Sequence, residues 1–206
     1  SQCPAEEHYT ALKGICRYLR RTKDWGIVYW RDKPVNELPD IPIDIPVVDP
    51  SLPEFPSAPL LQLTGFVDAA HATDLATRRS ITGLVFTLAG GAIAYKSKVQ
   101  ATVSTSSTEA EFIAAVHAAK IAKHLRFVLD ELGYPQSKAT PIYEDNQAAI
   151  AMINEDRPTT RSRHIDIQHF AIQEWRRRDI IEMIYIPTTI NPADASTKAL
   201  SWVLHS

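Results

Sequence analysis

The sequence predicts an α/β protein in which helices flank a five-stranded mixed sheet. Five short β-prone segments alternate with segments whose apolar residues follow a helical period. The first three strands of the predicted sheet follow one another directly, as in an antiparallel meander, whereas a helix precedes each of the last two. With 206 residues, 45% of them hydrophobic, the chain is long enough to bury a substantial core.

The N-terminal part is expected to be separate from this sheet. Residues 5–22 predict an amphipathic helix, because their apolar members recur at intervals of three and four, and a β-prone run follows at residues 25–30. Residues 34–59 hold eight of the 14 prolines and five acidic residues without Lys or Arg. So many prolines exclude a helix or a central strand and favour an extended linker. We therefore expect a helix and strand in residues 1–33, the linker, and one domain in residues 60–206.

The predicted meander occupies the start of that domain. Its first strand begins near Leu60 and ends on Asp68. Residues 80–98 form two further strands with a turn at Gly90 and Gly91, where glycine tolerates the backbone angles that tight turns require.

Helices and strands alternate in the second half of the domain. A long helix is predicted from Thr108 to Leu132, because Gly133 is a typical signal for a helix end. A proline is favoured at the first helical position, which places the start of the last helix at Pro192. The elements between these two helices are a strand at residues 139–144, helices at 146–154 and 163–178, and a strand at 180–186.

The net charge of −2 conceals an uneven distribution. Outside the proline-rich linker the chain has 22 basic and 19 acidic residues, a net charge of +3. If the four carboxylates described below are also set aside, the net charge is +7. The domain is therefore mildly basic around a small acidic site, which favours a polyanionic partner.

The two cysteines indicate a reducing environment. Cys3 and Cys16 are 13 residues apart in a mostly helical segment, or about 20 Å, which is too far for a disulfide. The sequence also has no apolar run of the length that a membrane span needs and no signal peptide at its start. We expect an intracellular protein with free thiols and no membrane contact.

Four carboxylates lie where predicted elements end or begin. Asp68 ends the first strand, Glu111 lies in the first turns of the long helix, Asp145 follows the fourth strand, and Asp194 lies near the start of the last helix. Ligand sites of α/β sheets gather at the carboxyl ends of strands. Clustered acids without a counter-charge repel one another, so they imply bound cations, and oxygen ligands favour Mg²⁺ or Mn²⁺. Taken alone, each aspartate could instead start a turn, cap a helix or complement a helix dipole.

The motif TEAEF contains two glutamates, of which only one can face the sheet. Apolar residues with small side chains follow Glu111 at helical spacing, whereas the stripe from Glu109 reaches Lys120 and Lys123. This pattern favours Glu111 as the ligand and Glu109 as an acid that the helix dipole stabilises. The stripe that follows Glu111 consists of Ala114, Ala115, Ala118, Ala122 and Leu125.

Several long motifs occur in a characteristic order between Leu63 and Leu200. They are GFVDA, RRSITGLVF, AIAYKSKVQATVSTSSTEAEF, IYEDNQAAIAM, RSRHIDIQHF and NPADASTKAL. Together they resemble the ribonuclease H domain of copia-type retrotransposon Pol polyproteins. Residues 6–29 are similar to the connecting segment that precedes this domain in those polyproteins.

The resemblance implies the ribonuclease H-like fold and hydrolysis of the RNA strand of an RNA/DNA hybrid with two Mg²⁺ or Mn²⁺ ions. It implies that Asp68 bridges the two ions and that Glu111, Asp145 and Asp194 complete their ligand sets. The expected partners are the hybrid and a reverse transcriptase polymerase domain in a parent polyprotein. The expected location is the cytoplasm, in a virus-like particle, or the nucleus.

Contacts to the hybrid are expected from polar side chains beside the metal site. Asn146 has helix capping as an equal alternative, and any single Lys or Arg could be a solvated surface charge. Cellular ribonucleases H carry a histidine before the last aspartate, but residues 187–193 contain none, so His164 is considered in its place with a structural role as the alternative. The expected contacts are Lys96, Lys98, Ser104, Ser106, Ser107, Asn146, Gln147, Arg163 and His164, with Arg161 and Arg176 to Arg178 as further phosphate binders.

Two other functions are compatible with this sequence. One is a catalytically idle module, captured by a host, that keeps the fold and binds nucleic acid or protein. The other keeps the metal site but acts on a different substrate, as integrase-like and exonuclease-like relatives do. The presence of all four acids argues against the first, and their order along the chain argues against the second.

Overall fold

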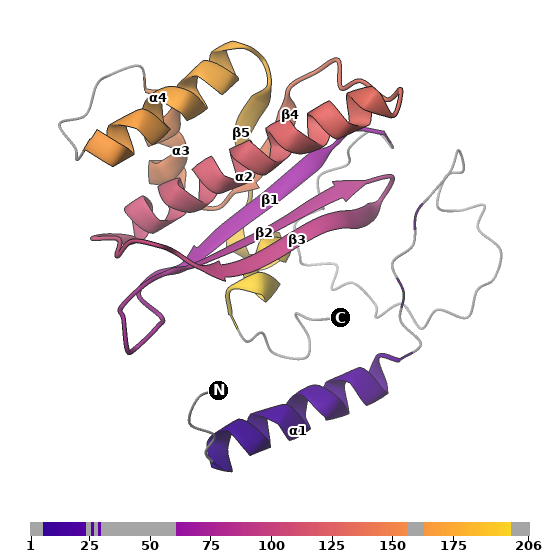
Figure 1. Cartoon of the computed structure of the whole chain (residues 1–206), viewed down its shortest axis with the longest axis vertical. Helices are drawn as coiled ribbons and strands as arrows, with labels where there is room; N and C mark the ends of the chain where they lie inside the picture. Colours follow the sequence, from indigo (N-terminus) through magenta and orange to yellow (C-terminus); the bar gives the residue numbers. More distant parts are fainter. Residues whose placement is uncertain (1–5, 24–25, 27–28, 30–60, 156–162, 199–206) are drawn as a thin grey trace.

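The computed structural model describes residues 6–23, 26, 29, 61–155 and 163–198, and the structural statements below concern these residues. They form the predicted α/β architecture with a five-stranded mixed sheet, which confirms the expected fold class (Figure 1). The elements are α1 (Glu6–Arg21), β1 (Thr64–Ala70), β2 (Ile81–Leu88), β3 (Gly91–Val99), α2 (Ser107–Glu131), β4 (Thr140–Glu144), α3 (Gln147–Asn154), α4 (Arg163–Arg177), β5 (Ile181–Tyr185) and the 3₁₀ turns η2 (Thr188–Ile190) and η3 (Pro192–Ser196).

The sheet has the strand order β3-β2-β1-β4-β5. Strands β1, β2 and β3 form the predicted antiparallel meander, whereas β4 pairs parallel to both β1 and β5. The pairing of β1 with β4 extends only from Gly65 opposite Ile142 to Phe66 opposite Tyr143. The two central strands are therefore no longer paired where they reach Asp68 and Asp145.

Two apolar clusters cover the two faces of the sheet. Val67 belongs to the main core, which includes residues of α2 and α4, whereas Phe66 packs with Ile186 and Ala193 in a smaller cluster beside η3. Successive residues of a strand point to opposite faces, so neighbouring positions of β1 contribute to different clusters. Figure 1 shows α2 lying across one face of the sheet.

Helix α2 confirms the expected periodic stripe. Its residues Ala114, Ala115, Ala118 and Ala122 are fully buried, and small side chains let the helix lie close to the sheet. The helix ends before Gly133, whose φ of +84° is an angle that favours glycine. The turn between β2 and β3 lies one position earlier than expected, because Ala89 and Gly90 have the positive φ angles.

The last helix differs from the prediction. Residues 192–196 form a 3₁₀ turn, in which the N–H of Thr197 donates to the carbonyl of Asp194, rather than the start of an α-helix. This turn packs closely on β2 at Gly83. A Cβ atom there would lie 2.5 Å from the methyl group of Thr197 and 2.9 Å from the carbonyl oxygen of Ala193, so only glycine fits.

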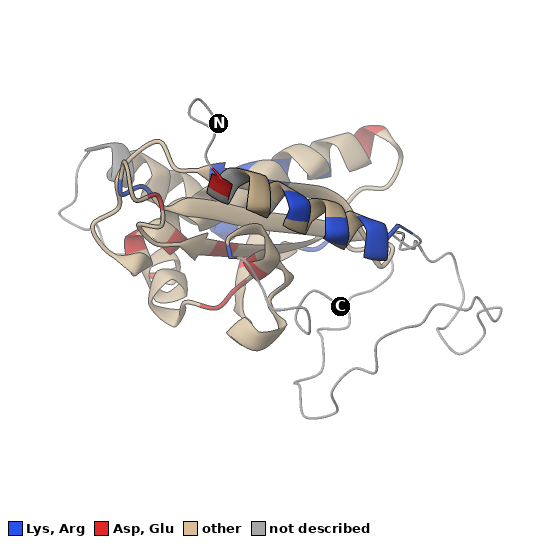
Figure 2. Cartoon of the chain, turned by 90° about the horizontal axis from the view of Figure 1, so that it is seen from below, with Lys and Arg blue, Asp and Glu red and all other residues tan. Residues whose placement is uncertain are grey.

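Helix α1 is amphipathic, as predicted, but its apolar face is exposed. More than half of each apolar side chain is exposed at Tyr9, Leu12, Ile15 and Leu19. Basic residues also lie along this helix, and two of them, Arg20 and Arg21, are in its last turn (Figure 2). Cys16 is an exposed free thiol. Among the described residues no helix is both long and apolar enough to cross a membrane.

Three of the expectations for the N-terminal part lie wholly or mostly outside the described residues. They concern Cys3, the strand at residues 25–30, of which only 26 and 29 are described, and the linker at residues 34–59, so the proposed domain boundaries stay predictions.

Candidate metal centre and nucleic-acid interface

Three aspartates from distant parts of the chain meet beside the sheet. Asp68 lies in β1, Asp145 directly follows β4, and Asp194 lies in η3. Each can offer one carboxylate oxygen such that the three atoms lie within 4.8 Å of one another. The close packing of η3 on Gly83, which pairs with Asp68 in the β1–β2 ladder, brings Asp194 to this position.

A second group of carboxylates lies beside the first and shares Asp145 with it. Here Glu111, Glu144 and Asp145 offer oxygens that lie within 4.8 Å of one another. The four acids expected from the sequence are therefore brought together, in two groups joined at Asp145.

Glu144 is a member that the sequence pattern did not single out. It is 0% exposed, and Ile142, two residues earlier in β4, is equally buried in the main core. A charged residue at a core-facing position of a strand is rarely buried without a partner. In the motif IYED, an acidic residue at a position that strand alternation predicts to be buried is the sequence signal that could have identified Glu144.

The second group contains unsatisfied carboxylate oxygens. Glu111 is 6% exposed, and one buried oxygen of Glu111 and one of Glu144 have no hydrogen-bond partner. Burial, followed by the charges of Asp68 and Asp145, raises the pKa of Glu111 from 4.5 to about 9. Burial and the charge of Glu111 likewise raise the pKa of Glu144 well above its usual value. Both side chains therefore need a proton or a cation.

The side chain of a lysine lies beside the aspartate group, which consists of Asp68, Asp145 and Asp194. The Nζ atom of Lys198 lies 2.8 Å from Oδ1 of Asp194 and 3.6 Å from Oδ1 of Asp68. Burial acts to lower the pKa of Lys198, but the hydrogen bond to Asp194 and the charge of Asp68 outweigh it and raise that pKa. Burial raises the pKa of Asp68, whereas the hydroxyl of Thr197, which donates to Oδ2 of Asp68, lowers it.

These donors fit divalent metal ions. All are carboxylate oxygens, which hard cations such as Mg²⁺ and Mn²⁺ prefer, and a cation would satisfy the unpartnered oxygens of Glu111 and Glu144. Lys198 supplies only part of the charge that the aspartate group requires. The group is partly accessible, because Asp145 and Asp194 are only half-buried.

The two glutamates of the TEAEF motif have different environments. Glu109 lies on the exposed side of the helix start, where its Oε2 accepts hydrogen bonds from the N–H and the hydroxyl of Thr105. Its own N–H donates to Oγ of Ser106, the N-cap residue of α2. This arrangement is close to a capping box, whereas Glu111 lies with the buried acids.

Several of the expected substrate contacts have roles inside the protein. Ser104 is buried and its Oγ lies 2.7 Å from Oγ of Ser80. Ser106 and Asn146 are the N-caps of α2 and α3, and Asn146 accepts from the N–H of Ala149 at 3.0 Å. Ser107 and Gln147 are exposed at the helix starts. The side chains of Arg163 and His164, and all of Arg161, lie outside the described part of the chain.

Two of the arginines at the end of α4 have partners within the protein. Arg176 donates to the carbonyl of Asn154, and Arg178 forms an ion pair with Glu174 at 3.2 Å.

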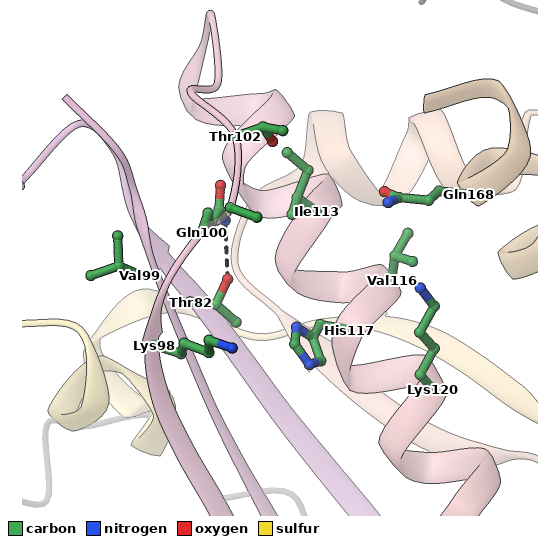
Figure 3. Close-up of a pocket in the computed structure, with 11 residues that line it drawn as sticks. Thr82, Lys98, Val99, Gln100, Thr102, Ile113, Val116, His117, Lys120 and Gln168 are labelled. Atoms are coloured by element: carbon green, nitrogen blue, oxygen red, sulfur yellow. Dashed lines mark hydrogen bonds between the residues drawn. The ribbon is translucent and has the colours of Figure 1, made fainter. Parts of the chain in front are cut away.

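A basic pocket of about 240 Å³ lies between β3 and α2. Figure 3 shows Lys98 of β3 and Lys120 of α2 on either side of His117. Lys96 lies 2.8 Å from Nε2 of His117. A lysine ammonium only donates, so this nitrogen of His117 accepts and the imidazole is neutral. Burial, followed by the charges of Lys96, Lys120 and Lys98, lowers the pKa of His117.

The pocket adjoins the start of α2 through Gln100. Nε2 of Gln100 donates to Oγ1 of Thr82 (Figure 3) and to the carbonyl of Ala110, the residue before Glu111. Oε1 of Gln100 is buried without a partner. Basic side chains thus lie beside the helix turn that carries Glu111, an arrangement that suits a phosphodiester backbone.

Comparisons with known proteins find transposon proteins among those similar to this chain. It is 34% identical over 197 residues to the retrovirus-related Pol polyprotein from transposon TNT 1-94 of Nicotiana tabacum, covering 96% of this chain but 13% of that protein. It is also 34% identical over 111 residues to the secreted RxLR effector protein 161 of Plasmopara viticola, covering 54% of this chain and 60% of the effector. No model of a protein family matches the chain.

A similar solved structure is that of LC11-RNase H1 in complex with an RNA/DNA hybrid. The sequence identity is 14% and the TM-score 0.49, and the match covers 65% of this chain and 92% of that one. The resemblance expected from the motifs is confirmed by the transposon relatives and by the sheet topology. The chain is similar to retrovirus-related Pol polyproteins of plant transposons, spans about an eighth of their length, and has a ribonuclease H-like fold.

Proposed function

We propose that this chain hydrolyses the RNA strand of RNA/DNA hybrids with the aid of two divalent metal ions. The observation that carries the proposal is the meeting of buried and half-buried carboxylates in two groups that share Asp145. Such acids are costly to bring together unless cations join them. The transposon relatives support the choice of a nucleic-acid substrate.

The protein's own residues would hold the reacting phosphate and its cations in fixed positions. Asp68 and Asp194 would contribute ligands on one side of Asp145, and Glu111 on the other. When bound, such ions activate a water molecule and stabilise the leaving oxygen of a phosphodiester. Lys198, which contacts Oδ1 of both Asp68 and Asp194, would compete with an ion for these two oxygens.

Catalysis of this kind depends on positioning rather than on a protein nucleophile. The short 3₁₀ turn over Gly83 and the N-cap of α3 at Asn146 keep Asp194 and Asp145 in place. The hydroxyl of Thr188 donates to Oδ2 of Asp145 at 2.6 Å and orients that carboxylate.

Incubation of the purified chain with three labelled substrates tests the proposal. The substrates are an RNA/DNA hybrid, duplex DNA and duplex RNA, each with Mg²⁺ and with a chelator. We expect cleavage of the RNA strand of the hybrid alone, and only with Mg²⁺. Cleavage in the presence of the chelator, or equal cleavage of duplex DNA, would contradict the proposed substrate and metal dependence.

Binding to the hybrid is expected to weaken with salt. Each phosphate contact contributes a slope of roughly −0.7 to −0.9 in log K against log salt, and we expect a total slope of about −2 to −4. Replacement of Lys98 and Lys120 by glutamine should reduce the size of this slope by about 1 to 2, because both line the basic pocket. The control is Lys138→Gln, before β4, which should leave the slope unchanged. Equal slopes for all three proteins would exclude the basic pocket as a phosphate site.

A second candidate is a module that keeps this fold and binds nucleic acid or protein without cleavage. The similarity to a protein named as a secreted effector, rather than as a polyprotein, favours it. This candidate predicts salt-dependent binding in the experiment above together with no cleavage of any of the three substrates at any Mg²⁺ concentration.

A further inference from the structure

We propose that Glu144 is a metal ligand and that, with Glu111 and Asp145, it forms a cation site on the α2 side of the sheet. The inference deepens the proposed function and rests on it only for the identity of the ions as Mg²⁺ or Mn²⁺. It adds a fifth carboxylate to the four that the sequence indicates.

The position of Glu144 in β4 directs its side chain to this site. Ile142 and Glu144 are two residues apart, so they share the face of the sheet that α2 covers, and Ile142 belongs to the main core. Glu111 approaches the same place from the first buried turns of α2. Asp145 follows at the end of the strand, where the pairing of β4 with β1 has already ended. The three side chains therefore converge from a strand, a helix and a strand end.

The hydrogen bonding of the two glutamates is incomplete in a way that points to a cation. Oε1 of Glu144 accepts from the N–H of Asn146 at 3.1 Å, but its other oxygen and one oxygen of Glu111 are buried with no partner. Buried carboxylate oxygens of this kind are normally hydrogen-bonded or bound to a metal. Within the described part of the chain, neither Glu111 nor Glu144 forms an ion pair with a lysine or arginine, and Lys198 pairs with Asp68 and Asp194 instead.

The spacing of the donors also suits one shared ion. Their oxygens lie within 4.8 Å of one another, and opposite ligands of an octahedral Mg²⁺ are about 4.2 Å apart. Movements of a few tenths of an ångström, within the rotamer wells of the side chains, would close this difference. The alternative is that Glu111 and Glu144 share a proton and bind no ion, which makes Glu144 a structural residue.

Mn²⁺ binding to the full chain separates these two possibilities. The probe is Mn²⁺ alone, with free Mn²⁺ measured by electron paramagnetic resonance and no nucleic acid present. We expect two ions per wild-type chain, and for Glu144→Gln either the loss of one ion or at least a tenfold weaker affinity for it. Glutamine has nearly the same volume and removes a buried charge, so circular dichroism should show that the variant folds.

Two matched variants complete the experiment. Glu131→Gln changes an exposed glutamate at the other end of α2, about 30 Å from Glu111, and should bind Mn²⁺ as the wild type does. Glu144→Asp keeps a carboxylate on a shorter side chain and should bind more tightly than Glu144→Gln. If Glu144→Gln fails to fold, Glu144→Asp replaces it as the test variant. The inference then requires that Glu144→Asp bind the second ion more weakly than the wild type does.

Unchanged Mn²⁺ binding by Glu144→Gln, or by Glu144→Asp in its place, would overturn the inference, as would fewer than two ions per wild-type chain. The result is independent of the cleavage assay. Two bound ions that depend on Glu144, in a protein that cleaves no hybrid, would support this site and count against the proposed nuclease. Cleavage of the hybrid by a protein whose Mn²⁺ binding does not depend on Glu144 would support the proposed nuclease and count against this site.

Discussion

Glu111→Gln is expected to be nearly inactive on an RNA/DNA hybrid at low Mg²⁺ concentration, whereas Glu109→Gln keeps most of its activity. Glu111 is buried among the acids and has an oxygen without a hydrogen-bond partner. Loss of a ligand carboxylate should cost on the order of 3 kcal/mol in the transition state, or at least a hundredfold in rate. Single-turnover cleavage over a range of Mg²⁺ concentrations measures this difference.

Glu109 is the matched control, because the same change of charge occurs two residues away. Its carboxylate accepts hydrogen bonds from Thr105 at the start of α2, so its replacement removes a helix-start interaction of less than about 1 kcal/mol. We expect a slightly lower melting temperature and an almost normal rate. An inactive Glu109→Gln with an active Glu111→Gln would move the ligand role to Glu109. Two active variants would remove the carboxylate mechanism.

Without divalent cations, the free energy of unfolding is expected to fall as the pH rises. Burial and the charges of Asp68 and Asp145 raise the pKa of Glu111 from 4.5 to about 9. Between these values the folded chain holds a proton that the unfolded chain has released, so each increase in pH favours unfolding. The contribution of Glu111 is fully present below pH 4.5 and is lost as the pH rises toward 9. One pKa unit corresponds to about 1.4 kcal/mol, which makes the loss on the order of a few kcal/mol.

Urea unfolding at pH 5, 7 and 9 in the presence of a chelator measures this effect. Glu111→Gln should flatten the profile, because glutamine does not titrate. Saturating Mg²⁺ should also reduce the loss at high pH, since ions bind the deprotonated carboxylates of the folded chain and not of the unfolded one. A wild-type profile that is flat from pH 5 to pH 9 without metal would show that the buried acids do not retain protons.

Local patterns in the sequence predicted most of the elements. The stripe of alanines after Glu111 identified the buried face of α2, and Gly133 identified its end. The apolar segments of the three meander strands and the short connection between β2 and β3 predicted antiparallel neighbours. Such features depend on the period of the side chains and on backbone angles within a few residues, so they can be read without knowledge of distant contacts.

The last helix shows where local signals were insufficient. Asn191 and Pro192 predicted the start of an α-helix, and the side chain of Asn191 does accept from the N–H of Ala193. The segment nevertheless forms a 3₁₀ turn that packs on β2, where Gly83 leaves no room for a side chain. This contact joins residues more than a hundred positions apart, and no local propensity encodes it.

The sequence by itself determined the α/β class, the order and type of the strands and the main helices, and the four acids at element ends. The tertiary structure alone decided which acids meet, since it divides them into two groups that share Asp145 and adds Glu144. It likewise decided the pairing of Lys198 with Asp194 and Asp68, and the pocket that Lys98 forms with Lys120. The physical reason is that side-chain period and turn chemistry act over a few residues, whereas the charge, burial and unsatisfied hydrogen bonds of a site depend on how the sheet register and helix packing place distant residues together.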